Sequence, residues 1–199
     1  IVVGRTNLFS VDLENCRLRL KEWRVPLKSI AVWRNLPNTL VVECAEHEPI
    51  AQLRKRGGRL IDRNGIILPP RNARRSWSLP VLTGVKGIQA LDVGEVAEDP
   101  MLHSGLYLLR TLQQDNDEEL FRVNMVQLNY GEEELVLYLR KQEPFCRNAQ
   151  IILPSQKRAL KHALKRVEQI VRERRRANQI TGKIDATYEN NVPVTPPPP

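Results

Sequence analysis

Residues 34–51, RNLPNTLVVECAEHEPIA, contain a turn, a strand and a domain boundary in one stretch. The β-branched run at 40–44 favours a strand. The Asn and Pro residues before it favour a turn that follows an earlier strand at 30–33. Glu48-Pro49 then ends the unit, because proline cannot donate to a ladder and holds the preceding residue extended. We therefore predict a domain boundary at Pro49.

Upstream of this stretch, the pattern predicts a strand at 1–3 and a helix at 11–22. Ser10 can cap the helix through its side-chain oxygen. Apolar residues such as Leu13 and Cys16 recur at three- and four-residue spacing, which indicates one buried helix face. The first domain is therefore predicted to be a strand–helix–strand–strand unit.

The cysteines indicate neither a disulfide framework nor a metal site, because they are odd in number and lie far apart in sequence. They are Cys16, Cys44 and Cys146. We expect Cys16 and Cys44 to be buried thiols, since free cysteine behaves as a small hydrophobe. A disulfide between these two residues is the alternative.

After Pro49 the sequence changes to short apolar runs joined by turn residues. Apolar runs at 59–62 and 66–68 flank Asn64-Gly65, a strong hairpin signal because both turn residues tolerate positive φ. Asp99-Pro100 then predicts the start of a helix that reaches residue 113, with a leucine stripe along one face. This second helix is expected to pack on a sheet.

From residue 120 to 152, apolar and polar residues alternate, which predicts strands with one solvated face. Ser155 can cap a long basic helix that ends near Arg176, with a seam of leucine and valine. Two last strands are predicted at 183–188 and 192–194, before a proline-rich tail.

The predicted class is therefore α+β, with a small first domain followed by a β-rich domain that carries packing helices. The boundaries are 1–49 for the first domain, 50–194 for the second and 195–199 for the tail. A hydrophobic fraction of 41% and a charged fraction of 27% are typical of a globular protein. No run reaches the roughly 18 apolar residues that a membrane-spanning helix needs.

The net charge of +8 divides into segments of opposite sign. Residues 157–176 hold nine Lys/Arg against two acidic residues, and residues 54–75 hold eight against one. Residues 92–134 hold eleven Asp/Glu against two Arg. This mixture is unlike the one-signed face that a nucleic-acid-binding protein presents.

The sequence predicts no catalytic, cofactor or metal site, and hence no enzyme. His47, His103 and His162 have no spacing that converges on a metal. No Walker, GxSxG, HExxH or GxGxxG sequence is present, and no nucleophile is paired with a base. The acidic runs at 115–119 and 132–134 are expected to be solvated turns, because no calcium-loop spacing accompanies them.

Several stretches match one family pattern in the same order along nearly the whole chain. They are NLFSVDL at 7–13, RNLPNTLVVECAEHEPIA at 34–51, RLIDRNGIILPP at 59–70, LPVLTG at 79–84 and KIDATY at 183–188. The chain resembles the FtsQ/DivIB family of bacterial cell-division proteins. It departs from that pattern at Leu36, where the family usually has Trp, and at Ala186-Thr187, where the family has Leu-Arg.

The resemblance implies a POTRA domain followed by the β domain of this family. It implies a non-enzymatic divisome scaffold that acts in septum formation and binds FtsB/DivIC-like and FtsL-like partners. It also implies a single N-terminal membrane anchor upstream of these residues. The chain is therefore expected on the extracytoplasmic, periplasmic side of the inner membrane.

The end of the chain is predicted to bind the partner, because a final strand offers unpaired N–H and C=O groups to an incoming peptide. Tyr188 either anchors that peptide or packs in the core, since alternation does not assign its face. Arg172 and Arg176 are expected to steer an acidic partner. The predicted partner-binding residues are Arg172, Arg176, Ile184, Thr187, Tyr188, Asn190, Asn191, Val192 and Val194.

Two other functions stay open. A nucleic-acid-binding protein would use the basic helix at 155–176, although its charges are expected to spread around the helix and the acidic block opposes them. A POTRA protein of outer-membrane assembly would need further POTRA repeats, and the sequence shows no second one.

Overall fold

The chain divides into two compact units, Ile1–Glu48 and Pro49–Pro199. The computed structural model describes residues 7–22, 26–53, 58–70, 79–114, 120–142, 144–188 and 192–196. Helices and a large mixed sheet make the fold α+β, which confirms the predicted class. Pro49, predicted as the last residue of the first domain, instead opens strand β3 (Pro49–Gln52) of the second unit.

The first unit combines helices with a two-stranded antiparallel sheet. Its elements are the 3-10 helix η1 (Leu8–Ser10), helix α1 (Leu13–Lys21), and strands β1 (Leu27–Asn35) and β2 (Thr39–Glu46). Arg34 of β1 ties the segment before α1 to the sheet. Its guanidinium donates to the carbonyl oxygens of Leu8 at 3.0 Å and Val11 at 2.6 Å. The predicted strand at 1–3 lies outside the described residues.

The cap of α1 is Asp12, so the prediction of Ser10 is wrong. The Asp12 side chain accepts a hydrogen bond from the N–H of Asn15 at 3.0 Å. Ser10 instead ends η1, and its hydroxyl donates to the carbonyl of Asn7 at 2.8 Å. Because η1 occupies these residues, the helix starts later than predicted.

The predicted burial of both first-unit cysteines is also wrong. Cys44 is exposed and Cys16 is half-buried, and both are free thiols. The cause is that α1 packs against β1, whereas Cys44 lies on the neighbouring strand β2. Among the described residues of this unit, Val11 is the one buried hydrophobic side chain.

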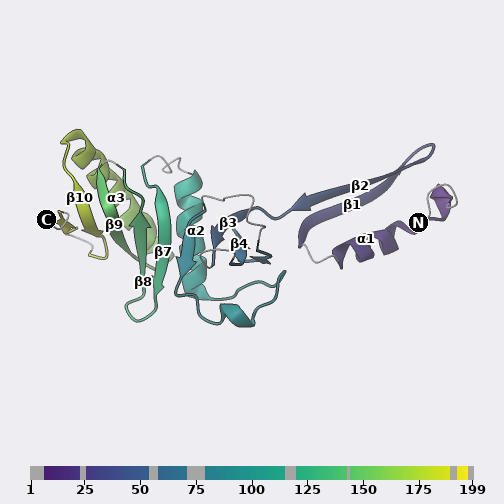
Figure 1. Cartoon of the computed structure of the whole chain (residues 1–199), viewed down its shortest axis with the longest axis horizontal. Coiled ribbons are helices and arrows are strands. Elements are labelled where there is room, and N and C mark those ends of the chain that lie inside the picture. Colours follow the sequence, from purple (N-terminus) through teal and green to yellow (C-terminus); the bar gives the residue numbers. More distant parts are fainter. Residues whose placement is uncertain are drawn as a thin grey trace. The chain divides into compact units, whose positions relative to one another are not determined.

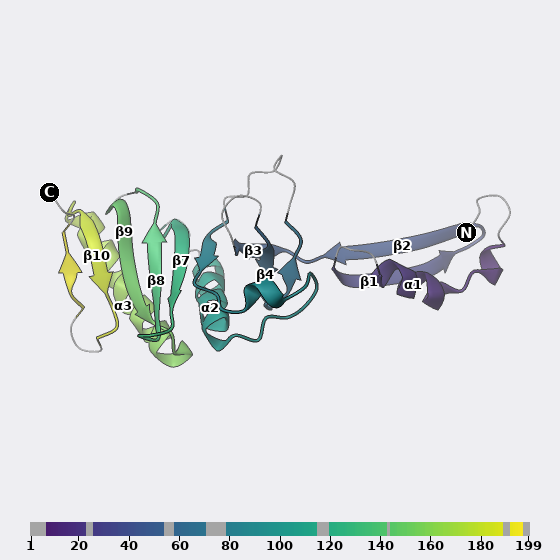
Figure 2. The ribbon, with the colours of Figure 1, turned by 60° about the horizontal axis from the view of Figure 1, so that its bottom comes forward.

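The second unit is built on a nine-stranded mixed sheet with the order β11-β10-β9-β8-β7-β6-β3-β4-β5. After β3 its strands are β4 (Leu60–Asp62), β5 (Ile67–Leu68), β6 (Val81–Thr83), β7 (Val123–Asn129), β8 (Glu134–Leu139), β9 (Phe145–Pro154), β10 (Thr181–Asp185) and β11 (Val194–Thr195). Helices α2 (Pro100–Gln114) and α3 (Lys157–Arg176) cover one face of this sheet (Figures 1 and 2), after the short 3-10 helix η2 (Ile88–Ala90).

Both helices follow the predicted apolar seams. Leu160, Leu164, Val167 and Val171 of α3 are buried, and the helix ends at Arg176 as predicted. In α2, Asp99 Oδ1 accepts from the N–H of Met101 at 2.9 Å and so caps the helix. The cap predicted for α3 is wrong, because Gln156 occupies the N-cap position and the N–H of Ser155 bonds to Glu133 instead.

The predicted hairpin around Asn64-Gly65 is confirmed, since β4 and β5 pair antiparallel on either side of it. Gly65 has a φ of 88°, while Asn64 keeps a negative φ. The Asp62 side chain accepts from the N–H of Asn64 at 2.8 Å and of Ile66 at 2.9 Å. A carboxylate at the end of β4 therefore stabilises the turn.

The sheet face opposite α2 and α3 is partly solvated, as the alternation predicts. On β8, Leu135, Leu137 and Leu139 are buried under the helices, while Val136 and Tyr138 between them are half-exposed. Register extends this pattern across the sheet, because Tyr138 lies opposite Met125 of β7 and Gln150 of β9.

The two edges of the sheet end differently. Beside β5, the N–H of Ile67 donates to Glu95 at 2.9 Å and the N–H of Gly94 donates to Ile67 at 2.8 Å. Val96 adds a bridge to Ile66, so residues 94–97 cover this edge. At the other edge, β11 pairs with β10, and the described residues place no strand beyond it.

Candidate functional site at the β11 edge

Strand β11 exposes its backbone on one side. Lys183 pairs with Thr195 and Ile184 with Val194, and the N–H of Asp185 donates to the carbonyl of Pro193 at 3.0 Å. In an antiparallel ladder, bonded and non-bonded pairs alternate. The N–H and C=O of Val194 therefore point away from β10, toward the outside of the sheet.

The prolines around β11 set the length of this outer ladder. Residues 192, 194 and 196 share the outward orientation, since backbone groups alternate along a strand. Pro193 lacks an N–H on its inner side, where β10 lies, so it leaves the outer side intact. Pro196 lacks an N–H on the outer side and so ends the row of donors. The outer edge thus offers two consecutive outward N–H groups, on Val192 and Val194.

Two arginines of α3 hold the two ends of β10. Arg174 donates from Nε to Thr181 Oγ1 at 2.7 Å and from Nη2 to the carbonyl of Ile180 at 3.1 Å. Arg166 donates from Nη1 to the carbonyl of Tyr188 at 2.9 Å. Because β11 pairs with β10, these contacts also position the open edge. Sequence reasoning did not predict either of these contacts.

The chain turns directly after β10, at residues 185–188. Asp185 Oδ1 accepts from the hydroxyl of Thr187 at 2.6 Å and from its N–H at 3.2 Å. The Tyr188 side chain that follows is 59% exposed, so it faces outward and does not pack in the core. Tyr188 is thus available to a partner at the start of the link to β11.

The structure corrects the predicted site at Ile184. Its side chain is 0% exposed and belongs to the core, because β10 is an interior strand flanked by β9 and β11. Val192 and Val194 are half-buried and pack against the same core, so they offer backbone rather than side-chain contacts. Asn190 and Asn191 lie outside the described residues. The predicted tail is also shortened, since Thr195 belongs to β11.

Five exposed basic residues of α3 share its solvent face, whereas Arg166 and Arg174 are half-buried and reach toward β10. The buried seam occupies the other side, so cations at three-, four- and seven-residue spacing form one exposed row. This row consists of Arg158, Lys161, Lys165, Arg172 and Arg176. Arg172 forms an ion pair with Glu168 at 2.6 Å, which reduces the field that it presents to a partner.

An acidic group lies near β10 on the solvated sheet face. Burial, together with a hydrogen bond and the negative charge of Glu132, raises the pKa of Glu134 above its usual range. The charge of Asp185 acts in the same direction, while Lys183 opposes it. The site therefore has basic charge on α3 and acidic charge on the opposite face of the sheet.

The described residues do not suggest a metal centre or a membrane helix. None of them form a cluster of three or more His, Cys, Asp or Glu side chains that could hold a metal ion. Within the same residues, each helix is too short or too polar to cross a bilayer.

Comparison of the chain with models of known protein families gives no match. Comparison with curated proteins likewise gives no significant match.

Proposed function

We propose that this protein is a non-enzymatic scaffold that binds a partner segment by adding a strand to β11. The observation that carries the proposal is the open outer side of β11, where two N–H groups point away from the sheet. An extended peptide can satisfy these groups through main-chain hydrogen bonds. The clamps from Arg166 and Arg174 support it, because a rigid edge loses little entropy on binding.

The biological setting that we propose follows from the resemblance to FtsQ/DivIB. The chain would act in the bacterial divisome during septum formation, with FtsB/DivIC-like and FtsL-like proteins as partners. It would do so on the extracytoplasmic side of the inner membrane, held by a single N-terminal helix. The division of the chain into a small first unit and a larger second unit built on a nine-stranded sheet is compatible with this setting.

Replacement of Val194 by proline tests the backbone mechanism. Val194→Pro removes one outward N–H and leaves the inner pairing with β10 in place. We expect at least a tenfold loss of affinity for a purified FtsB/DivIC-like segment, measured by calorimetry. Val194→Ala is the matched control, because it keeps the N–H and should change the affinity less than threefold. Unchanged binding by a folded Val194→Pro variant would contradict the proposal.

The exposed basic row of α3 favours nucleic-acid binding as a second candidate function. Five cations along one helix face can neutralise phosphates, and the resulting affinity would fall steeply with salt. A duplex-binding titration between 50 and 200 mM salt separates the two functions. Val194→Pro should leave duplex binding unchanged, whereas neutralising Lys161 and Lys165 together should weaken it.

A further inference from the structure

The solvent face of α3 carries a straight row of positive charge. The basic row extends over residues 158–176, which is about 27 Å at the ~1.5 Å rise per residue of an α-helix. At ~100° per residue, its five cations fall within a sector of roughly 60°. All five side chains are exposed, so they can contact one plane at the same time.

The two acidic residues of α3 are already engaged within the helix. Glu168 pairs with Arg172 at 2.6 Å, and Glu173 accepts a hydrogen bond from Gln169 Nε2 at 3.0 Å. They offset two of the nine Lys/Arg of α3. The acidic group around Glu134 lies on the opposite face of the sheet. The second unit is therefore polarised, and a negatively charged surface would attract it with α3 foremost.

An exposed apolar side chain lies just beyond the basic row. Ile180 follows the end of α3 and its side chain is 59% exposed. Arg174 Nη2 donates to the carbonyl of Ile180 at 3.1 Å, which holds the backbone at this position. In the interfacial region of a bilayer, such a side chain adds apolar burial to the electrostatic attraction. A nucleic-acid backbone offers it no apolar environment, so this combination favours a lipid surface over a duplex.

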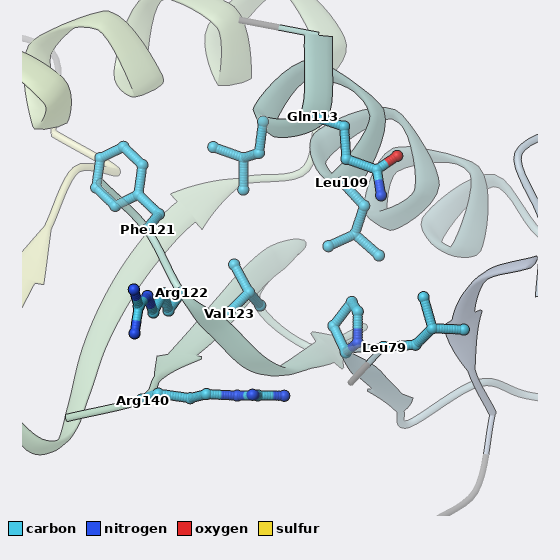
Figure 3. A pocket seen from close by; sticks show the side chains of 9 residues that line it. Leu79, Leu109, Gln113, Phe121, Arg122, Val123 and Arg140 are labelled. Atoms are coloured by element: carbon cyan, nitrogen blue, oxygen red, sulfur yellow. The ribbon is translucent and has the colours of Figure 1, made fainter. Parts of the chain in front are cut away.

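The second unit also contains a cavity of about 360 Å³. Figure 3 shows Leu109 and Gln113 projecting from α2 toward Phe121 and Val123, which line this cavity with them. None of the residues that line it belongs to α3. Capture of one lipid in this cavity would therefore leave the basic row without a ligand, whereas an extended anionic surface contacts the whole row.

We propose that α3 docks the protein onto an anionic phospholipid surface, with the basic row on the headgroups and Ile180 at the acyl boundary. The apolar seam of α3 stays buried against the sheet, so the protein adsorbs through side chains and the helix does not insert. The attraction falls with salt, because the charges on both sides are exposed. The surface does not include β11, so its failure would leave the partner-binding proposal untouched.

Vesicle flotation of the full chain tests the proposal with two lipid compositions. Vesicles of phosphatidylcholine alone are compared with vesicles in which one lipid in three is phosphatidylglycerol. At about 50 mM salt we expect at least a tenfold preference for the anionic vesicles. At about 300 mM salt most of this preference should be lost, because the Debye length becomes shorter.

Neutralising two cations of the basic row tests the role of α3. Lys161→Gln combined with Lys165→Gln should lower partitioning onto anionic vesicles at least tenfold, since each cation near the surface contributes roughly fivefold. Arg63→Gln combined with Lys141→Gln is the control, because it removes the same charge from two exposed positions outside α3. The control should change partitioning less than twofold.

Ile180→Ser tests the apolar contribution separately. It should lower partitioning by about threefold at both salt concentrations, because this contribution depends on apolar burial and not on charge. Val194→Pro should bind vesicles like the unchanged chain, which keeps the result distinct from strand addition at β11. Thermal melting should show that all variants are folded.

The proposal is overturned if phosphatidylcholine vesicles bind the chain as tightly as anionic ones. It is also overturned if the Lys161 and Lys165 double variant behaves like its control, or if Ile180→Ser partitions like the unchanged chain. Binding to a DNA duplex without binding to anionic vesicles would overturn it in favour of nucleic-acid binding.

Discussion

The two edges of the large sheet show two solutions to the same physical problem. An edge strand carries unpaired N–H and C=O groups that attract other strands. At β5 the chain satisfies them itself, because residues 94–97 return along the strand and pair with Ile66 and Ile67. At β11 the described residues supply no such cover. The difference indicates that an open edge is avoidable in this fold, which supports a binding function for β11.

Amide hydrogen exchange should give the largest contrast between the edges. The Ile67 N–H bonds to Glu95, so its exchange requires an opening of the covered edge and should be slowed by ~10³-fold or more. The Val194 N–H points outward and should exchange close to the rate of an unstructured peptide. Exchange monitored by NMR near neutral pH checks this contrast. Equal protection of the two amides would show that something covers β11.

Side-chain truncation should separate the edges energetically. Ile67 is 0% exposed, so Ile67→Ala should lower the free energy of unfolding by about 2–5 kcal/mol. Val194 is only half-buried on a two-residue strand, so Val194→Ala should cost about 1 kcal/mol or less. Urea denaturation of both variants measures the difference. A larger loss at Val194 would mean that β11 is part of the stability core.

High pH should loosen the covered edge. Residues 94–97 lead into Asp99, which accepts a hydrogen bond from the Tyr130 hydroxyl. Burial, followed by this hydrogen bond, raises the pKa of Tyr130 to about 12. In the unfolded chain the tyrosine titrates near 10, so the unfolded state loses its proton first. The contribution of Tyr130 to stability is therefore complete below about pH 10 and is lost as the pH rises toward 12.

Tyr130→Phe should flatten this part of the stability profile between about pH 10 and 12. Urea midpoints at several pH values measure the slope, and Tyr188→Phe is the control because Tyr188 is exposed. The expectation fails if the slope of Tyr130→Phe matches that of the control.

Charge reversal on α3 should have the smallest effect, and it concerns the open edge. Arg176→Glu should slow association with an acidic partner by about three- to tenfold at low salt, because it reverses the steering field. Arg172→Glu should have a smaller effect, since Glu168 already pairs with Arg172. Stopped-flow association at low and high salt measures both. Effects confined to the dissociation rate would exclude steering.

The long elements of the second unit could be predicted because their signals agree with one another. In α3, the spacing of Leu160, Leu164 and Val167 indicates both the helix and its buried face, and the structure places them there. The turn at Asn64-Gly65 likewise combines turn chemistry with flanking apolar runs. Where the hydrophobic spacing and the turn residues indicate the same structure, tertiary packing seldom favours a different one.

Caps and edge register could not be predicted, because each depends on competition between near-equivalent neighbours. Ser10 and Asp12 can both cap a helix, and the 3-10 turn at η1 decides in favour of Asp12. Ile184 fits an edge strand as well as an interior one by alternation. Only the pairing of β10 with both β9 and β11 places its side chain in the core. The contacts of Arg166 and Arg174 with the β10 region leave no local signal in the sequence, because an arginine that reaches another strand follows the same helical spacing as one that faces solvent.

The alternation of prolines and valines at the end of the chain has a consequence for mutational tolerance. If main-chain groups form the outer ladder, the side chains at 192 and 194 can vary among small apolar residues while recognition persists. Proline is the exception, because at either position it removes the donor that a partner needs. A saturation library over residues 192–196 should therefore be permissive, with proline depleted at 192 and 194 and tolerated at 193 and 196. The spacing of that depletion would record, residue by residue, which side of β11 the partner occupies.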